Sequence, residues 1–163
     1  MRAGYLTRKT ADGMSRSGAT TVELALVAPL LIFLLFGIIE FGLMVKDVVG
    51  LNQAAREGAR VAAVGATPTT LNNRVVSAAP TIQGANIVTL YERRSYNEDT
   101  GTWSEWTALG TVDGENDAAQ GDQIKVTLTY PHPLVTGRLF SGLADDPEQG
   151  TITLRAAIIM LRE

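Results

Sequence analysis

The chain has 163 residues, 45% of them hydrophobic, a formal net charge of -3 at pH 7 and no cysteine. This length allows one domain, or a membrane anchor followed by one small domain. The absence of cysteine excludes disulfide frameworks, thiolate metal sites and thiol nucleophiles. The one histidine, His132, stands between two prolines, which argues against a catalytic triad or a multi-histidine metal site.

The charges are distributed unevenly along the chain. Four of the 14 basic residues but only one of the 17 acidic residues lie within residues 1–18, so the rest of the chain is acidic. A basic head before an apolar run is typical of a membrane topology signal, with the head in the cytoplasm and the body outside. Since no basic patch exists beyond the head, nucleic acid is not expected as a partner.

Residues 22–45, VELALVAPLLIFLLFGIIEFGLMV, form an apolar run that contains two acids, Glu23 and Glu40. The 16 uncharged residues between these acids span about 24 Å as a helix, at about 1.5 Å per residue. Crossing the hydrocarbon takes about 20 residues, so one or both carboxylates should lie at the edge of the lipid or inside it. We therefore predict a cytoplasmic leader at 1–18 and a transmembrane helix at 19–45.

Two other interpretations compete with a membrane helix. A cleaved secretory signal has an apolar region of about 7 to 15 residues and a small-x-small site, whereas this run is longer and lacks an obvious site. A buried core helix would be apolar on every face, which a body of this size could hardly enclose. Pro29 leaves one carbonyl without its helical partner and should bend the helix. Such a bend suits an isolated anchor or a helix that packs beside copies of itself.

The helical pattern continues beyond the apolar run, and its first clear stop is Gly65 with Pro68. A helix over 22–64 would be about 65 Å long at about 1.5 Å per residue. Its second half, 46–66, is expected outside the membrane. The predicted helix-packing residues there are small and recur every four positions: Gly50, Ala54, Gly58, Ala62 and Ala66. This strip permits close approach of a sheet or another helix, within the chain's own domain or in an assembly.

Residues 67–163 are predicted to form an extracytoplasmic α+β body. A short second helix should begin with Thr67 as its cap and Pro68 in its first turn, and should end before Pro80. The period then changes to two, which predicts a small antiparallel sheet against the second half of the long helix. Its four strands are expected at 85–94, 102–109, 122–130 and 151–161.

The strand at 122–130 shows the clearest alternation. Its predicted inward residues are Ile124, Val126, Leu128 and Tyr130, and its predicted outward residues are Lys125, Thr127 and Thr129. Trp103 and Trp106 alternate faces in the preceding strand. At least one of these two rings should therefore lie in the core, and an aromatic binding site is the alternative.

No catalytic, cofactor-binding or metal-binding residues stand out. The acidic loop DGENDAAQGD at 113–122 has alternating acids, as the first ligands of an EF-hand do. However, Ala118 replaces the glycine that the calcium loop requires, and Ile124 replaces its final glutamate, so a solvated loop is the better interpretation. Without a nucleophile, an acid–base pair or a phosphate loop, the chain is not predicted to be an enzyme, and no small-molecule substrate is evident.

Gly18 followed by ATTVE, with Ala19 first and Glu23 last, is similar to the processing site of type IV pilins and pseudopilins. In those families a basic leader ends in glycine, and a glutamate stands fifth in the mature chain. RSGATTVELALVAPLLIFLLFGIIEFG and NQAAREGARVAA resemble the N-terminal signature of TadE-like proteins, the pseudopilins of tight-adherence (Tad) pili. GDQIKVTLTYPHPL and TITLRAAIIMLRE resemble the C-terminal half of that family.

The resemblance implies a pilin-like fold and a minor pilin or pseudopilin anchored in the cytoplasmic membrane that takes part in Tad pilus assembly. Its partners would be other pilins, the Tad assembly machinery and a prepilin peptidase that cuts between Gly18 and Ala19. Glu23 would set the register of one subunit against the amino terminus of another, unless its carboxylate merely reaches the headgroups. The alternative function is a bitopic membrane protein whose extracytoplasmic domain binds a ligand or an envelope partner.

Overall fold

The structure is a computed structural model that describes residues 13–82 and 86–163. The chain divides into two compact units, Met1–Ile39 and Glu40–Glu163. Helix α1 (Gly13–Ala63) contributes to both of them. Residues 1–12 of the predicted leader lie outside the described residues. So does residue 85, the first of the strand predicted at 85–94.

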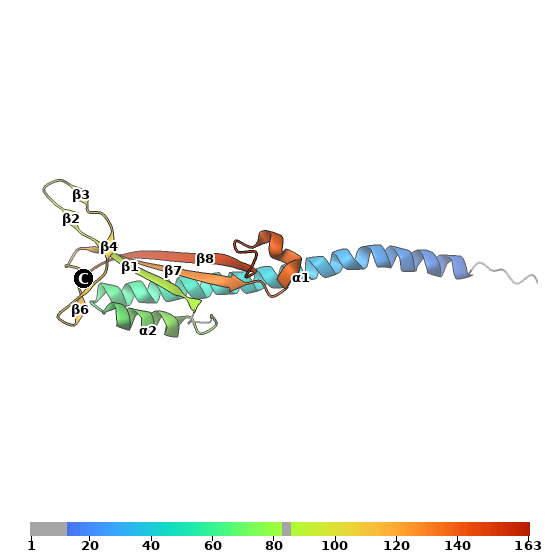
Figure 1. The fold of residues 1–163 in the computed structure, drawn as a ribbon, viewed down its shortest axis with the longest axis horizontal. Helices are drawn as coiled ribbons and strands as arrows, with labels where there is room; N and C mark the ends of the chain where they lie inside the picture. Colours follow the sequence, from blue (N-terminus) through green and yellow to red (C-terminus); the bar gives the residue numbers. More distant parts are fainter. Residues whose placement is uncertain (1–12, 83–85) are drawn as a thin grey trace, which may run out of the picture. The chain divides into compact units, whose positions relative to one another are not determined.

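The expected α+β fold is confirmed: a long helix and a short one accompany a four-stranded antiparallel sheet (Figure 1). The elements after α1 are, in chain order, α2 (Pro68–Ala78), β1 (Val88–Arg94), β2 (Tyr96–Asn97), β3 (Thr102–Trp103), β4 (Thr107–Ala108), β5 (Thr111–Val112), β6 (Glu115–Asn116), β7 (Gln123–Pro133), the 3-10 helix η2 (Gly137–Leu143) and β8 (Thr151–Leu161).

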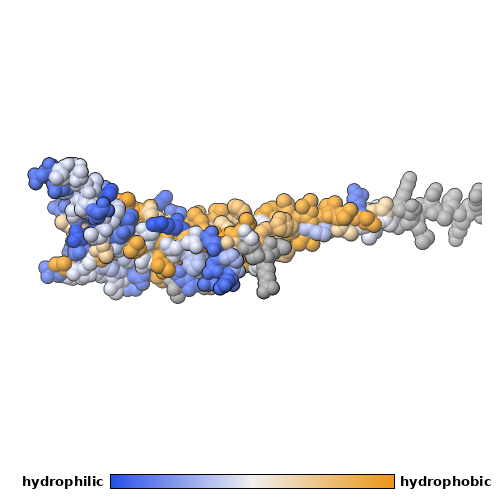
Figure 2. Space-filling model, turned by 45° about the horizontal axis from the view of Figure 1, so that its top comes forward, coloured by the Kyte–Doolittle hydropathy of each residue, from blue (hydrophilic) through white to orange (hydrophobic). Residues whose placement is uncertain are grey.

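In the first unit the described residues belong to α1, which continues through Pro29. None of the side chains described from Gly18 to Ile39 is buried, and Figure 2 shows apolar surface along this part of the helix. By length and composition, Gly18–Ala63 includes a stretch that is suited to crossing a membrane. A helix that is apolar on all sides needs an apolar surrounding, because water would otherwise contact every face.

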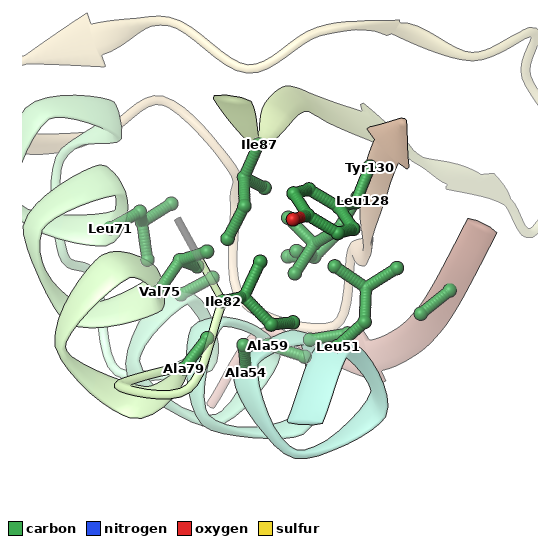
Figure 3. Packing of buried hydrophobic residues seen from close by; sticks show 14 of the residues in the cluster. Leu51, Ala54, Ala59, Leu71, Val75, Ala79, Ile82, Ile87, Leu128 and Tyr130 are labelled. Carbon is green, nitrogen blue, oxygen red and sulfur yellow. The ribbon is translucent and has the colours of Figure 1, made fainter. Parts of the chain in front are cut away.

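In the second unit, α1 and α2 cover one face of the sheet, whose strand order is β4-β1-β7-β8. All neighbouring strands are antiparallel. The core forms where the small residues of α1 meet α2 and the inward side chains of β7 (Figure 3). The six largest fully buried side chains come from these three elements: Leu51, Leu71, Val75, Ile124, Val126 and Leu128.

The predicted inward residues of β7 are confirmed, since all four are buried. The outward face differs from the expectation at Thr127, which is only 4% exposed. Thr127 lies in a central strand, directly between Leu90 of β1 and Ala157 of β8. Its cross-strand neighbours therefore cover a small side chain even on the face opposite the helices.

Helix α1 ends as the sequence predicts. Gly65 has a positive φ of 97°, which favours glycine because it lacks a Cβ, and its N–H donates to the carbonyl of Ala62. The side-chain amide of Asn116 in β6 donates to the carbonyls of Ala62 (2.8 Å) and Ala66 (3.0 Å). The first bond gives a carbonyl of the last turn a second donor, and the second satisfies a carbonyl of the segment between α1 and α2. The predicted cap of α2 is confirmed as well, because Thr67 accepts from the following turn.

Two predicted segments differ from the structure. The expected strand at 102–109 is divided into β3, which pairs with β2, and β4, which pairs with β1. The acidic loop expected at 113–122 includes β6, which pairs with β5 just before it as the hairpin β5–β6. Its two-residue turn has positive φ at both Asp113 (52°) and Gly114 (85°), the combination that a type I′ hairpin turn requires.

Candidate functional site

The predicted processing site lies in the first unit, near the start of the described part of α1. Gly18, Ala19 and Glu23 are all exposed there. Glu23, Leu24 and Thr20 line a shallow and mainly apolar depression on the helix surface. Leu24, the apolar residue next to Glu23, is 63% exposed, so the Glu23 carboxylate lies at the edge of an apolar surface. Cleavage after Gly18 and a register role for Glu23 stay predictions.

The predicted helix-packing strip contacts the chain's own body. Ala54 and Ala62 are fully buried, and a Cβ on Gly50 would lie 3.4 Å from the side chain of Ile82. A Cβ on Gly58 would lie only 2.8 Å from Cγ2 of Val75 in α2. This face of α1 is thus filled within the chain, and its role in assembly stays a prediction, as does that of Pro29.

The opposite face of this part of α1 is polar and exposed. The guanidinium of Arg60 donates two hydrogen bonds to the carboxylate of Glu57, at 2.8 and 2.9 Å. These bonds hold the pKa of the Glu57 carboxyl below its usual value. Because the Arg60 side chain is 64% exposed, the pair belongs to a solvated surface and adds little to stability.

A buried polar cluster in the second unit was not predicted as a site. It consists of Glu40 and Asp47 on α1 and His132 near the end of β7, which are 4%, 8% and 2% exposed. Nδ1 of His132 lies 2.8 Å from Oδ2 of Asp47, and Nε2 lies 3.9 Å from Oε1 of Glu40. An Nδ1–H group therefore donates to Asp47, while Nε2 faces the second carboxylate without a hydrogen-bond partner among the described residues.

The carboxylate of Glu40 also binds the segment that follows β7. Its Oε1 accepts from the backbone N–H of Val135 at 3.0 Å. Its Oε2 accepts from the N–H of Thr136 at 3.0 Å and from the Thr136 hydroxyl at 2.8 Å. A carboxylate that accepts three hydrogen bonds is well satisfied away from water. Glu40 therefore connects the helix to a loop 95 residues further along the chain.

The two ring nitrogens of His132 face two carboxylates, that of Asp47 at Nδ1 and that of Glu40 at Nε2. The described residues contain no group of three or more histidine, aspartate or glutamate side chains arranged to hold a metal ion. The cluster instead joins α1 to the end of the sheet.

Two tryptophans form a second group, at the other end of β7. The guanidinium carbon of Arg94 lies 4.4 Å from the ring centre of Trp106 and 5.1 Å from that of Trp103, and Nζ of Lys125 lies 4.1 Å from Trp106. Both rings are only partly buried. The expectation that one of them lies in the core is therefore wrong, because cations on the outer face of the sheet hold the rings there.

Three of the four acids of the loop at 113–122 lie within 4 Å of an arginine nitrogen, the third being Asp122 at 3.6 Å from Arg93. Asp117 lies 3.1 Å from Arg93, and Glu115 lies 2.7 Å from Arg162. Asp117 also accepts from the backbone N–H of Gly110 at 2.7 Å. These carboxylates therefore connect the hairpin β5–β6 to β1 and to the residue after β8.

The fold and these groups define the class of the protein: an α+β body that follows a long, exposed apolar helix and contains a buried polar cluster. Residues 18–60 match the model of the family described as TadE-like protein. The predicted resemblance is thereby confirmed over these residues, which form most of α1. No curated protein and no solved structure matches the chain. The TadE-like segment indicates a protein associated with Tad pili, with α1 as its candidate membrane anchor.

Proposed function

We propose that this protein is a membrane-anchored pseudopilin or minor pilin that takes part in assembling a Tad-type pilus. The observation that carries the proposal is the TadE-like match at residues 18–60. The same residues form one helix that is apolar and exposed in its first part and packed on a body in its second part. Such a helix can be held in a membrane at one end and present a folded domain at the other.

The orientation follows from charge. The basic residues precede the apolar run, so the N-terminus stays in the cytoplasm, and the soluble part of the long helix (46–66) and the body (67–163) lie outside the cytoplasmic membrane. The chain crosses the membrane once. From this position it meets other pilins or pseudopilins through α1 and meets the Tad machinery at the membrane.

Processing is the step that separates a pseudopilin from an ordinary anchor. On this proposal a prepilin peptidase cuts the chain after Gly18, which exposes a new amino group at Ala19. The negatively charged Glu23 is one helical turn away from that amino group along α1. Pairing between the carboxylate of one subunit and the amino group of another would offset the cost of a charge in lipid, about 2.5–3.5 kcal/mol.

The test is the N-terminus of the protein extracted from membranes, in a host with its prepilin peptidase and in the same host without it. We expect a chain that begins at Ala19 with the peptidase and retains residues 1–18 without it. Mass spectrometry of the intact protein separates the two forms. A Gly18→Leu variant should keep the leader in both hosts, since a bulky residue replaces the glycine at the cut.

A chain that keeps its leader in both hosts would contradict the proposal. The alternative, a bitopic protein whose body binds a ligand or an envelope partner, predicts that result. In that case substitutions in the loops of the sheet, and not in α1, should abolish function.

A further inference from the structure

The uncharged part of α1 between Glu23 and Glu40 is too short to cross a bilayer, and contacts of Glu40 in the second unit explain how the span becomes longer. Between Glu23 and Glu40 the helix covers only about 24 Å at about 1.5 Å per residue, less than the roughly 30 Å of a bilayer's hydrocarbon. A charged Glu40 exposed to lipid would end the span there. In the structure, however, Glu40 is only 4% exposed.

Because Glu40 is covered, the next charge that α1 exposes is Lys46. The surface without an exposed charge therefore runs from Leu24 to Val45, or about 33 Å at about 1.5 Å per residue. That length matches the hydrocarbon of a bilayer. The groups that cover Glu40 must then lie at the membrane boundary, since the span needs the residues on both sides of it.

These covering groups form a loop that is suited to an interface. Its first four backbone N–H groups, at residues 134–137, all donate within the protein: to Gly150 (2.9 Å), to the two oxygens of Glu40 (3.0 Å each) and to Leu134 (3.3 Å). Irregular backbone near lipid is tolerated only when its polar groups are satisfied in this way. Figure 1 shows η2, the later part of the loop, beside α1 at the end of the sheet.

The two segments that meet at Glu40 both carry exposed apolar side chains. They belong to the first turns of α1 beyond Ile39 and to the loop, and each is more than half exposed: Phe41 (65%), Val45 (56%), Val135 (66%) and Leu143 (65%). We call these four residues the apolar collar. Two of them come from α1 itself, so the collar continues the apolar surface of the membrane-spanning stretch without a gap in the chain.

We propose that the apolar collar lies in the lipid interface, so that residues 134–143 form a second membrane contact beside the helix. The proposal rests on the membrane anchoring proposed above. The exposed Asp145 follows Leu143 closely, which keeps the C-terminal end of the loop in the headgroup region. Glu40 is the residue that holds the loop at this depth, through the hydrogen bonds to Val135 and Thr136.

The test uses the full chain in vesicles of phosphatidylethanolamine and phosphatidylglycerol. The chain has no cysteine, so a single introduced cysteine carries one environment-sensitive fluorophore. The variants are Val135→Cys and Leu143→Cys in the collar and Leu31→Cys in the span. Val112→Cys on β5 is the matched control, because Val112 is 57% exposed and apolar but lies in the hairpin β5–β6, which contacts the C-terminal end of α1 at Ala62. A lipid that carries a nitroxide near its headgroup quenches fluorophores at the interface, and a lipid that carries a nitroxide near the middle of its acyl chain quenches fluorophores in the hydrocarbon.

We expect the headgroup nitroxide to quench the labels at 135 and 143, the acyl-chain nitroxide to quench the label at 31, and neither to change the label at 112. Quenching at 31 with none at 135 and 143 would overturn the collar and leave the anchor intact. Equal quenching at 112, 135 and 143 would also overturn it, because the body would then adsorb without a preferred face. No quenching at 31 would overturn the membrane anchor, and the collar with it.

Discussion

At the residue scale, the carboxylate of Glu40 connects α1 to the loop that follows β7. It accepts three hydrogen bonds from Val135 and Thr136 and lies 3.9 Å from Nε2 of His132. Removing an acceptor from buried donors costs more than the bond itself contributes, because the donors then lack both protein and water. The cluster should therefore stabilise the fold mainly by connecting two segments that are distant in the sequence.

We predict that Glu40→Ala lowers the free energy of unfolding of the body by about 1–3 kcal/mol, because it leaves buried donors without an acceptor. Glu40→Gln should recover only part of this loss, since an amide offers one acceptor oxygen and places an NH₂ group against the donors. Urea unfolding of the full chain in detergent, followed by the fluorescence of its two tryptophans, measures the change.

Glu105→Ala is the control for this experiment, because Glu105 lies exposed in the segment between β3 and β4. Its effect should stay within about 0.5 kcal/mol, as is usual for surface substitutions. If Glu40→Ala proved as stable as Glu105→Ala, the hydrogen bonds of Glu40 would not hold the loop.

The cluster shows why single residues are harder to predict than elements. His132 continues the alternation of Ile124, Val126, Leu128 and Tyr130, so its burial could have been predicted. Glu40 and Asp47 are seven residues apart and hence lie on one face of a helix. The sequence does not reveal that this face meets the end of β7, because the pairing depends on how the helix crosses the sheet.

At the element scale, the contact between α1 and α2 depends on a glycine. An ideal Cβ at Gly58 would lie 2.8 Å from Cγ2 of Val75 and 3.4 Å from Cγ1 of Val126. The first distance is shorter than real Cβ contacts, and both neighbours are fully buried, β-branched side chains with little freedom to move. Small residues on α1 therefore set how closely α2 and the sheet approach it.

We predict that Gly58→Ala destabilises the body even though alanine favours helix by about 1 kcal/mol over glycine. The overpacking against Val75 should cost about 1–3 kcal/mol. In a Val75→Ala background the clash is removed, so the same Gly58→Ala substitution should become neutral or stabilising. A double-mutant cycle of unfolding free energies measures this coupling. Equal effects of Gly58→Ala in both backgrounds would show that Val75 does not limit the helix contact.

The elements differ in how well the sequence predicts them. The long helix, the second helix and β7 have sustained periods and clear stop signals, and the structure confirms them. The two-residue strands β3 to β6 are too short for any alternation to be recognised. The pair Asp113-Gly114 nevertheless indicates the β5–β6 hairpin, because Asp-Gly is typical of a two-residue hairpin turn. The hairpin was not predicted because these residues were interpreted as part of a solvated acidic loop.

At the scale of the whole molecule, the two parts of α1 have different surfaces available to partners. From Gly50 to Ala62 the small-residue face is filled by the chain's own body. From Gly18 to Ile39 no described side chain is buried, so this part of the helix is free to contact lipid or neighbouring helices. If the protein enters a pilus, we expect the first contacts between subunits to form along this exposed part, where Glu23 is the one charge.

We therefore predict that Glu23→Ala inserts into the membrane more readily than the natural chain and yet fails to support piliation. Insertion improves because removing a carboxylate from the lipid boundary saves up to about 2.5–3.5 kcal/mol. Piliation fails because a neighbour's amino group loses its partner. Glu23→Gln should fail as well, which would assign the effect to charge rather than size. Leu26→Ala, which truncates a side chain that is 75% exposed one turn away, is the control and should still support piliation. Membrane fractionation measures insertion, and electron microscopy of the cells measures pili; normal piliation with Glu23→Ala would exclude the register role.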